Sequence, residues 1–272
     1  MVAVYDRPKT MSRPVRIVTA ESVTQLGDVA GQVLVAGSHG GIVAAAYAAR
    51  AGVRALIVHD AGIGKDGAGV AGLAWLEALG IAAAAVGHAS ARIGDGRDML
   101  ARGIISRANA LAASLGVRPG LRCHDAAVLL IKSPQGRRYE GCAAEGRHDL
   151  ARGVVGLDSI GMVEASDAGQ ILVIGSHASL HGGRAESALP IDASLVFFHE
   201  AGGDCSRLPV LAERGIAAAA AARESARIGD ARSLWDTGAV SRVNRPASEA
   251  GLREGMSVQA AADRFIAARK RG

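Results

Sequence analysis

The chain has 272 residues, of which 49% are hydrophobic, 21% are charged and 36 are glycines. This composition is typical of a globular protein, and no apolar run is long enough for a membrane span or a signal peptide. The net charge is +5, but basic and acidic residues are interspersed and only 3% are aromatic, so we expect no nucleic-acid partner. Three cysteines without metal-ligand spacing favour a cytoplasmic protein.

Strands and helices are predicted to alternate in the first part of the chain. Short apolar runs predict strands at 32–37, 54–59 and 81–86. Alanine-rich stretches predict helices at 42–51 and 70–79, followed by a longer helix at 98–115. Connections of this length imply right-handed crossovers and a mostly parallel, Rossmann-like α/β sheet. After these elements, residues 126–142 predict a hairpin.

The second part of the chain repeats the first. Residues 80–120 align without a gap on residues 215–255 and are identical at 21 of 41 positions. We therefore predict an internal duplication, with homologous α/β halves at 15–131 and 154–266 related by a pseudo-two-fold axis. A polar linker or hairpin at 132–153 joins them. The sequence leaves open whether the chain also forms a homo-oligomer.

Polar side chains follow the predicted strands, where open parallel sheets bind their ligands. Three histidines lie at three successive strand ends of the first half, which we expect to carry the active site. In this hypothesis His59 is a base oriented by Asp60, and Ser38 is a nucleophile or a polarising group. The candidate catalytic residues are Ser38, His39, His59, Asp60 and Lys65.

Further residues are predicted to bind substrate. Backbone N–H groups of the strand-to-helix turn suit an oxyanion, and a glycine-rich loop at 62–72 is expected to carry Lys65 as a mobile cation. An insertion at 180–183 of the second half could reach across to cap the site. Arg92 and Asp95 either bind substrate or form a structural ion pair, in which case Arg92 should be largely buried. The substrate-binding candidates are Gly40, Gly41, His88, Ser90, Arg92, Asp95 and His181.

These patterns predict an enzyme that needs no cofactor and acts on a small carboxylate-bearing substrate, with hydrolysis of an amide or a related carbonyl compound as the leading reaction. The same base and donors suit a lyase or an isomerase. A metal hydrolase with ligands from His39, His59, His88 and Asp60 is another alternative, although the leading hypothesis includes no metal. A non-catalytic protein that binds a metabolite or serves in assembly is the third. The sequence lacks a nicotinamide-binding fingerprint, and its few aromatic residues argue against a flavin.

Overall fold

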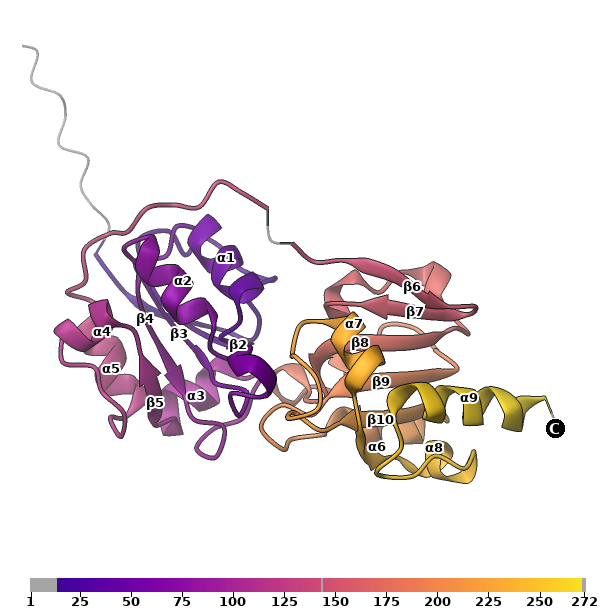
Figure 1. The fold of residues 1–272 in the computed structure, drawn as a ribbon. Helices are drawn as coiled ribbons and strands as arrows, with labels where there is room; N and C mark the ends of the chain where they lie inside the picture. Colours follow the sequence, from indigo (N-terminus) through magenta and orange to yellow (C-terminus); the bar gives the residue numbers. More distant parts are fainter. Residues whose placement is uncertain (1–13, 143, 271–272) are drawn as a thin grey trace, which may run out of the picture.

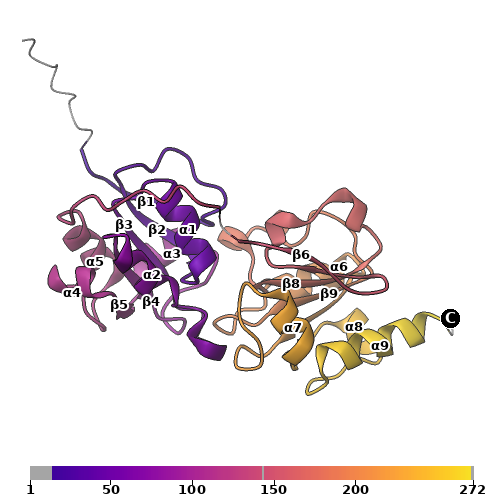
Figure 2. The same ribbon diagram turned by 45° about the horizontal axis from the view of Figure 1, so that its top comes forward.

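The computed structural model describes residues 14–142 and 144–270. They form a mixed α/β protein with two mostly parallel sheets, each in its own lobe with helices packed against it (Figure 1). Figure 2, turned by 45°, shows the same two lobes side by side. Within the described ranges, no helix combines the length and the apolar character that crossing a membrane requires.

The sheet of the first lobe has five strands in sequential order, β1-β2-β3-β4-β5. Its strands are Ile17–Ala20 (β1), Val33–His39 (β2), Ala55–His59 (β3), Ala82–Val86 (β4) and Ile105–Ala108 (β5). β1 to β4 are parallel, and β5 is antiparallel to β4 at the edge. The helices of this lobe are Ile42–Arg50 (α1), Gly72–Ala78 (α2), Gly96–Arg102 (α3), Ala110–Ser114 (α4) and Cys123–Leu130 (α5), with a 3-10 turn at Lys65–Gly67 (η1).

Both faces of this sheet are buried under helices. Successive side chains of a strand point to opposite faces, so each strand contributes to both buried layers. Leu34 and Leu56 pack with α1 and α2 on one face. Val35 and Ile57 pack with α3 and α5 on the other. A strand that is buried on both sides is a continuous apolar run in the sequence, which is why the strands predicted at 32–37, 54–59 and 81–86 are confirmed to within one or two residues.

The sheet of the second lobe has six strands in the order β11-β10-β9-β8-β7-β6. Its strands are Arg147–Ala151 (β6), Val154–Leu157 (β7), Ile171–His177 (β8), Leu195–His199 (β9), Ala217–Ala221 (β10) and Val240–Val243 (β11). Its helices are Arg207–Glu213 (α6), Ala231–Thr237 (α7), Arg245–Glu249 (α8) and Val258–Arg269 (α9), with 3-10 turns at Ile160–Met162 (η2), Ala165–Asp167 (η3), His181–Gly183 (η4) and Ala185–Ser187 (η5). β7 to β11 have the same order and directions as β1 to β5, and β6 adds an antiparallel edge.

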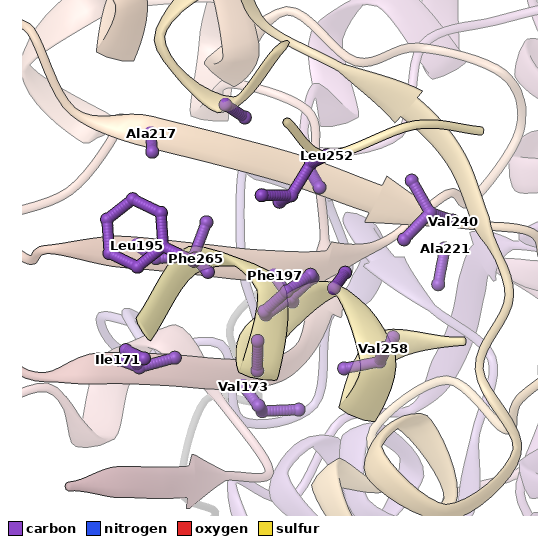
Figure 3. Packing of buried hydrophobic residues seen from close by; sticks show 14 of the residues in the cluster. Ile171, Val173, Leu195, Phe197, Ala217, Ala221, Val240, Leu252, Val258 and Phe265 are labelled. Carbon is purple, nitrogen blue, oxygen red and sulfur yellow. The ribbon is translucent and has the colours of Figure 1, made fainter. Parts of the chain in front are cut away.

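Larger side chains fill the core of the second lobe. Figure 3 shows Val258 and Phe265 of α9 over Leu195 and Phe197 of β9, with Val173 of β8 beside them. The exposed fraction of Phe197 is 0%. Burial of aromatic and branched side chains of this size contributes about 1.5–3 kcal/mol each, so α9 is an integral part of this lobe.

Two predicted elements are wrong. Residues 98–115 do not form one helix but contain the end of α3, the edge strand β5 and α4. The chain leaves the helix at Gly103, where an added Cβ would lie 2.4 Å from the carbonyl oxygen of Met99, and then pairs with β4. The predicted hairpin at 126–142 is also absent, because α5 extends to Leu130 and residues 134–140 then run along the first lobe without regular structure. Arg137 N–H donates to the carbonyl of Leu79 there.

A buried asparagine joins the sheet to its helices in each lobe. Asn109 and Asn244 are 6% and 7% exposed, and each uses its whole amide group. Asn109 accepts from the N–H groups of Ala83 and Ala112 and donates to the carbonyls of Leu73 and Ile81. Asn244 makes the same four bonds with Ala218, Ala247, Leu208 and Ile216. The two lobes therefore share a core contact as well as a strand order.

The two lobes meet at the carboxyl ends of their central strands. Ala61 and Ile93 of the first lobe pack against Ala201 and Ile228 of the second in a small buried apolar cluster. Backbone hydrogen bonds cross beside this cluster, from Lys65 N–H to the carbonyl of Arg223 and from Gly182 N–H to the carbonyl of Gly94. This arrangement brings the histidines at the ends of β2 and β8 to one cavity.

Candidate functional site

A cavity of about 420 Å³ lies between the lobes. Corresponding residues of the two lobes form much of its wall: Ser22, Val23, Ser38 and His39 from the first, and Ser159, Ile160, Ser176 and His177 from the second. The other polar residues that line it include Tyr47, Glu145, Asp158, His181, Arg184, Glu186 and Ser187. A concave site with converging polar groups is the usual form of a small-molecule site.

Ser38 and Ser176 have the same environment at the ends of β2 and β8. The Oγ of Ser38 accepts a hydrogen bond from Val23 N–H at 3.0 Å, and the Oγ of Ser176 accepts one from Ile160 N–H at 2.9 Å. Among the described residues, neither hydroxyl donates to a protein acceptor. Each serine therefore fixes a loop with its oxygen and keeps its hydroxyl hydrogen available at the cavity.

His39 and His177 are matched in the same way. The Nδ1 of His39 accepts from Gly41 N–H at 3.1 Å, and the Nδ1 of His177 accepts from Ser179 N–H at 3.3 Å. A neutral imidazole has one donor and one acceptor nitrogen, so the proton of each ring is on Nε2. Neither Nε2 has a hydrogen-bond partner within the described ranges, and both rings line the cavity.

Both rings are neutral at pH 7. Burial, with a smaller contribution from His199 and His59, lowers the pKa of His39 to about 4. Burial, followed by His181 and Arg207, holds the pKa of His177 well below its ordinary value. Desolvation and nearby positive charge both disfavour the imidazolium. The two rings are therefore N–H donors toward the cavity rather than cations.

Each ring packs against a glycine of the opposite lobe. A Cβ on Gly229 would lie 3.3 Å from the Cε1 of His39, and a Cβ on Gly94 would lie 3.1 Å from the Cε1 of His177. Both glycines have positive φ, 77° and 81°, a backbone conformation that larger residues avoid. The repeated Ile-Gly-Asp segment of one lobe thus shapes the contact for the histidine of the other.

The segment 180–187 of the second lobe reaches the first lobe. Gly182 N–H donates to the carbonyl of Gly94 at 2.8 Å, and Arg184 forms an ion pair with Glu21. The ring of His181 lies 5.5 Å from that of His177, centroid to centroid. Burial and then the charge of Arg207 lower the pKa of His181 to about 4, which makes it a third neutral imidazole at the cavity.

Arg207 lies fully buried behind this wall. Its Nη1 donates to the carbonyls of Ser187 and Ala188, and its Nε donates to that of His177 at 3.3 Å. Its Nη2 has no partner, and no carboxylate is hydrogen-bonded to it within the described part of the chain. Burial lowers its pKa to about 10, so the group is still a cation at pH 7. Asp204 offsets this charge in part, but it is not hydrogen-bonded to the guanidinium, so a positive charge remains behind the second-lobe wall.

Tyr47 and Glu145 form a hydrogen-bonded pair at the cavity. The hydroxyl of Tyr47 donates to the Oε2 of Glu145 at 2.8 Å. Burial and this carboxylate raise the pKa of Tyr47 to about 12. The phenol is therefore protonated at pH 7 and orients a carboxylate that can accept a proton.

Of the residues that the sequence singled out, the cavity brings together Ser38, His39 and His181. His59 is 0% exposed, and both of its ring nitrogens are bonded to backbone: Nδ1 accepts from Ala61 N–H at 3.0 Å, and Nε2 donates to the carbonyl of Ala91 at 3.1 Å. Such a ring has no free nitrogen with which to act as a base. Its position is that of a structural residue beneath the contact between the lobes.

Asp60 orients His88 rather than His59. Its carboxylate accepts from the N–H groups of Gly62 and His88, from the Nδ1 of His88 at 3.2 Å and from the hydroxyl of Ser106 at 2.8 Å. Four donors satisfy a carboxylate that is only 3% exposed. This cluster is separate from the cavity wall.

The predicted oxyanion donors are also used elsewhere. Gly40 N–H donates to the carbonyl of His59 at 2.9 Å, and Gly41 N–H donates to the Nδ1 of His39. Neither amide is free for a substrate. The function of Gly41 is instead to fix the tautomer of His39.

Lys65 is bonded to the second lobe. Its Nζ donates to the Oγ1 of Thr237 at 2.9 Å and to the carbonyl of Ser225 at 3.3 Å, and neighbouring Asp66 pairs with Arg227. Both side chains of the loop that was expected to be mobile therefore have partners in the second lobe. Lys65 does not line the cavity.

Ser90, Arg92 and Asp95 make local contacts. The hydroxyl of Ser90 donates to the carbonyl of Gly87 and accepts from Ile104 N–H, and Asp95 caps α3 by accepting from Asp98 N–H. Arg92 pairs with Asp95 at 2.9 Å, but its side chain is 55% exposed. The expectation of a buried Arg92 is therefore wrong, because the guanidinium lies over the helix start at the surface.

The metal alternative gains no support from the geometry. In the ranges that the structure describes, no three His, Cys, Asp or Glu side chains are grouped so that they could hold a metal ion. His59 uses both nitrogens on backbone groups, as noted above. No protein-family model, curated protein or solved structure matches this chain.

Proposed function

We propose that the cavity is the active site of a cofactor-independent enzyme that acts on the carbonyl group of a small, carboxylate-bearing compound. The observation that carries this proposal is the matched pair of neutral N–H donors, the Nε2 groups of His39 and His177. A neutral imidazole donates to a carbonyl oxygen and stabilises the negative charge that develops there during reaction. Their fixed tautomers mean that no reorganisation is needed at that moment.

The electrostatics of the wall supports the same chemistry. Arg207 is a buried cation without a bonded carboxylate, and it lies directly behind His177. A fixed positive charge next to the cavity favours both an anionic substrate and an oxyanion.

The carboxylate of Glu145 is our candidate for the base. In the proposed step it takes a proton from the carbon next to the carbonyl, the C–H electron pair forms a C=C bond, and the carbonyl electrons move to the oxygen that His39 or His177 holds. Return of a proton to the carbon completes an isomerisation, and loss of a neighbouring leaving group completes an elimination. Tyr47 positions Glu145 for this step through their 2.8 Å hydrogen bond.

This geometry favours the lyase or isomerase alternative over hydrolysis through a serine ester. The Oγ of Ser38 is bonded to Val23 N–H, and no histidine in the described part of the chain is hydrogen-bonded to it. A nucleophilic serine needs such a base. Amide hydrolysis would instead require water activated by Glu145, and it is the second candidate.

We further propose that the two lobes arose by duplication of one Rossmann-like unit and are related by a pseudo-two-fold axis. The gap-free sequence repeat, the shared order of five strands and the identical bonds of Asn109 and Asn244 support this history. On this proposal the cavity lies on the axis, and both lobes contribute to one site.

The proposed reaction can be tested without a known substrate. The protein is incubated in D₂O with a panel of small 2-oxo acids, hydroxy acids and carboxylic amides, and proton NMR follows each compound. Loss of a C–H signal next to a carbonyl indicates proton abstraction, and a new acid and amine indicate hydrolysis. Compounds that bind in the cavity without any change would assign the protein to metabolite binding instead.

Variants at His177 connect such turnover to the site. The amide of His177→Asn can still accept from Ser179 N–H but removes the Nε2 donor, and we expect it to lower kcat by about 100-fold. His177→Gln places an amide donor near the position of Nε2 and should retain more activity. His124→Asn, at a surface side chain that is 60% exposed, is the control and should change nothing.

A further inference from the structure

The donors of the cavity form two matching sets on its two walls. At the end of β2, the hydroxyl of Ser38 and the Nε2–H of His39 belong to the first lobe. At the end of β8, the hydroxyl of Ser176 and the Nε2–H of His177 belong to the second. In all four residues a backbone N–H occupies the acceptor atom, so that the hydrogen remains for a ligand.

Two donors that line the same cavity and have no protein acceptor suit a carboxylate. A carboxylate only accepts hydrogen bonds, and its two oxygens can accept two at once. A buried donor without an acceptor is costly, so each set is best satisfied by one such group. A ligand with a single carboxylate would leave the other set unbonded.

A source of positive charge lies near each wall. Arg207 supplies it on the second-lobe side, as described above. On the first-lobe side the nine-residue helix α1 begins at Ile42 without a side-chain cap, and Val43 and Ala44 of its first turn line the cavity. The N-terminus of a helix carries about half a positive charge.

The acidic residues at the cavity do not occupy these donors. Asp158 accepts from the N–H groups of Gly146 and Ala231, and Glu145 accepts from Tyr47. Glu186 is exposed. Among the hydrogen bonds of the described residues, none joins an acidic side chain to either donor set.

We propose that the ligand of this cavity is a small dicarboxylate, with one carboxylate on Ser38 and His39 and the other on Ser176 and His177. This proposal rests on the proposed active site and specifies its substrate class: the carbonyl of the proposed step is then the C=O of one of the two carboxylates, and the proton leaves the carbon next to it. The two ends of the ligand meet equivalent groups, so its carboxylates are bound in equivalent ways and its central carbons lie between the two walls.

Isothermal titration calorimetry with matched acids tests this assignment. Malonate, succinate, glutarate and adipate are each compared with the monocarboxylate of the same chain length at pH 7.5 and constant ionic strength. We expect one diacid to bind about 100-fold more tightly than its monocarboxylate, since the second carboxylate adds two charge-assisted hydrogen bonds. The optimum chain length measures the separation of the two sets.

Single substitutions test the equivalence of the two walls. Ser38→Ala and Ser176→Ala should each weaken binding of the best diacid by about tenfold, because each removes one donor to a carboxylate. Ser114→Ala is the matched control, since this exposed serine of α4 donates only to the carbonyl of Leu111. Circular dichroism establishes that each variant is folded, and His177→Asn, which removes the Nε2 donor, provides a second probe if a serine variant is not.

The outcomes separate this inference from the proposed function. Equal affinity for diacid and monocarboxylate, or a loss from only one of the two serine variants, would overturn the dicarboxylate assignment while leaving the carbonyl site intact. Tighter binding of inorganic phosphate than of any diacid would also overturn it. If the folded protein binds no carboxylate at all, both proposals fail.

Discussion

The protonation of His181 should make the stability of the protein depend on pH. In the folded chain the pKa of His181 is about 4, whereas an unperturbed histidine has a value of 6.5. Between these values the unfolded chain binds a proton that the folded chain does not. The stabilisation is therefore fully present above pH 6.5, and it is lost progressively as the pH falls toward 4.

The size of this effect follows from the shift. One pKa unit corresponds to about 1.4 kcal/mol, so a shift from 6.5 to about 4 costs the folded state about 3 kcal/mol by pH 4. His39 adds a contribution of the same sign, because its pKa is also about 4. Replacing His181 with glutamine removes one titrating ring and should reduce the loss between pH 7.5 and pH 4.5 by about 2–3 kcal/mol.

Urea unfolding followed by circular dichroism at several pH values measures this difference. His124→Gln is the control and should follow the wild-type curve, since this histidine lies at the surface of α5. An identical pH dependence for wild type and His181→Gln would refute the reasoning. An NMR titration of the His181 ring with a midpoint near 6.5 would refute it independently.

Three further predictions concern residues outside the cavity that stabilise the lobes or the contact between them. Asn109→Ala and Asn244→Ala should each lower the free energy of unfolding by about 3 kcal/mol, because four buried backbone groups lose their partner; a loss below about 1 kcal/mol in urea titration would contradict this. Arg92→Ala should cost less than about 1 kcal/mol in the same assay, because its ion pairs with Asp95 and Asp98 involve an exposed guanidinium, and a larger loss would indicate a contact beyond these two. Lys65→Met should lower Tm by about 2–4 °C in calorimetry without weakening diacid binding, since its bonds join the lobes; a selective loss of binding would return it to the site.

The sequence was sufficient for the central strands of the first lobe but not for the edges. Runs such as Leu56–Val58 are apolar because both faces of the sheet are covered, and that pattern is local. β5 is an edge strand that carries the polar residues Ser106 and Arg107, and short helices precede and follow it in the sequence. Its mixture of apolar and polar residues therefore looks like part of one amphipathic helix. β1 and β6 are also edge strands, and only their partners identify them.

The candidate site was predictable in part. The turn with Ser38 and His39 and the insertion with His181 were identified because strand ends and unique insertions attract ligands. His59 was expected to be the base, but both of its ring nitrogens are hydrogen-bonded to backbone groups. The spacing of residues in the sequence does not reveal such bonds. His177 was not among the candidates because the active site was expected in the first half, whereas the structure places it in the wall of the same cavity as His39.

No sequence pattern indicated that Arg207 and Glu145 lie at the site. The burial of Arg207 depends on the segment 180–188 folding over it, and that segment offers only backbone carbonyls. Glu145 lies in the polar region after α5 and lines the cavity next to Tyr47, to which it is hydrogen-bonded. Both positions follow from long-range packing, which is not encoded in local periodicity.

The alanine strands have a consequence for which mutations the protein can tolerate. β10 consists of five alanines, and in β4 four alanines precede a valine; all of them are buried, with helices packed against them. Alanine loses no rotamer freedom on folding, so these strands are ordered at a low entropic cost. Any larger residue would push a helix away from the sheet and cost about 1–3 kcal/mol, while glycine would loosen the strand. In a scan of all single substitutions, these buried alanines should therefore be among the positions where substitution destabilises the protein most often.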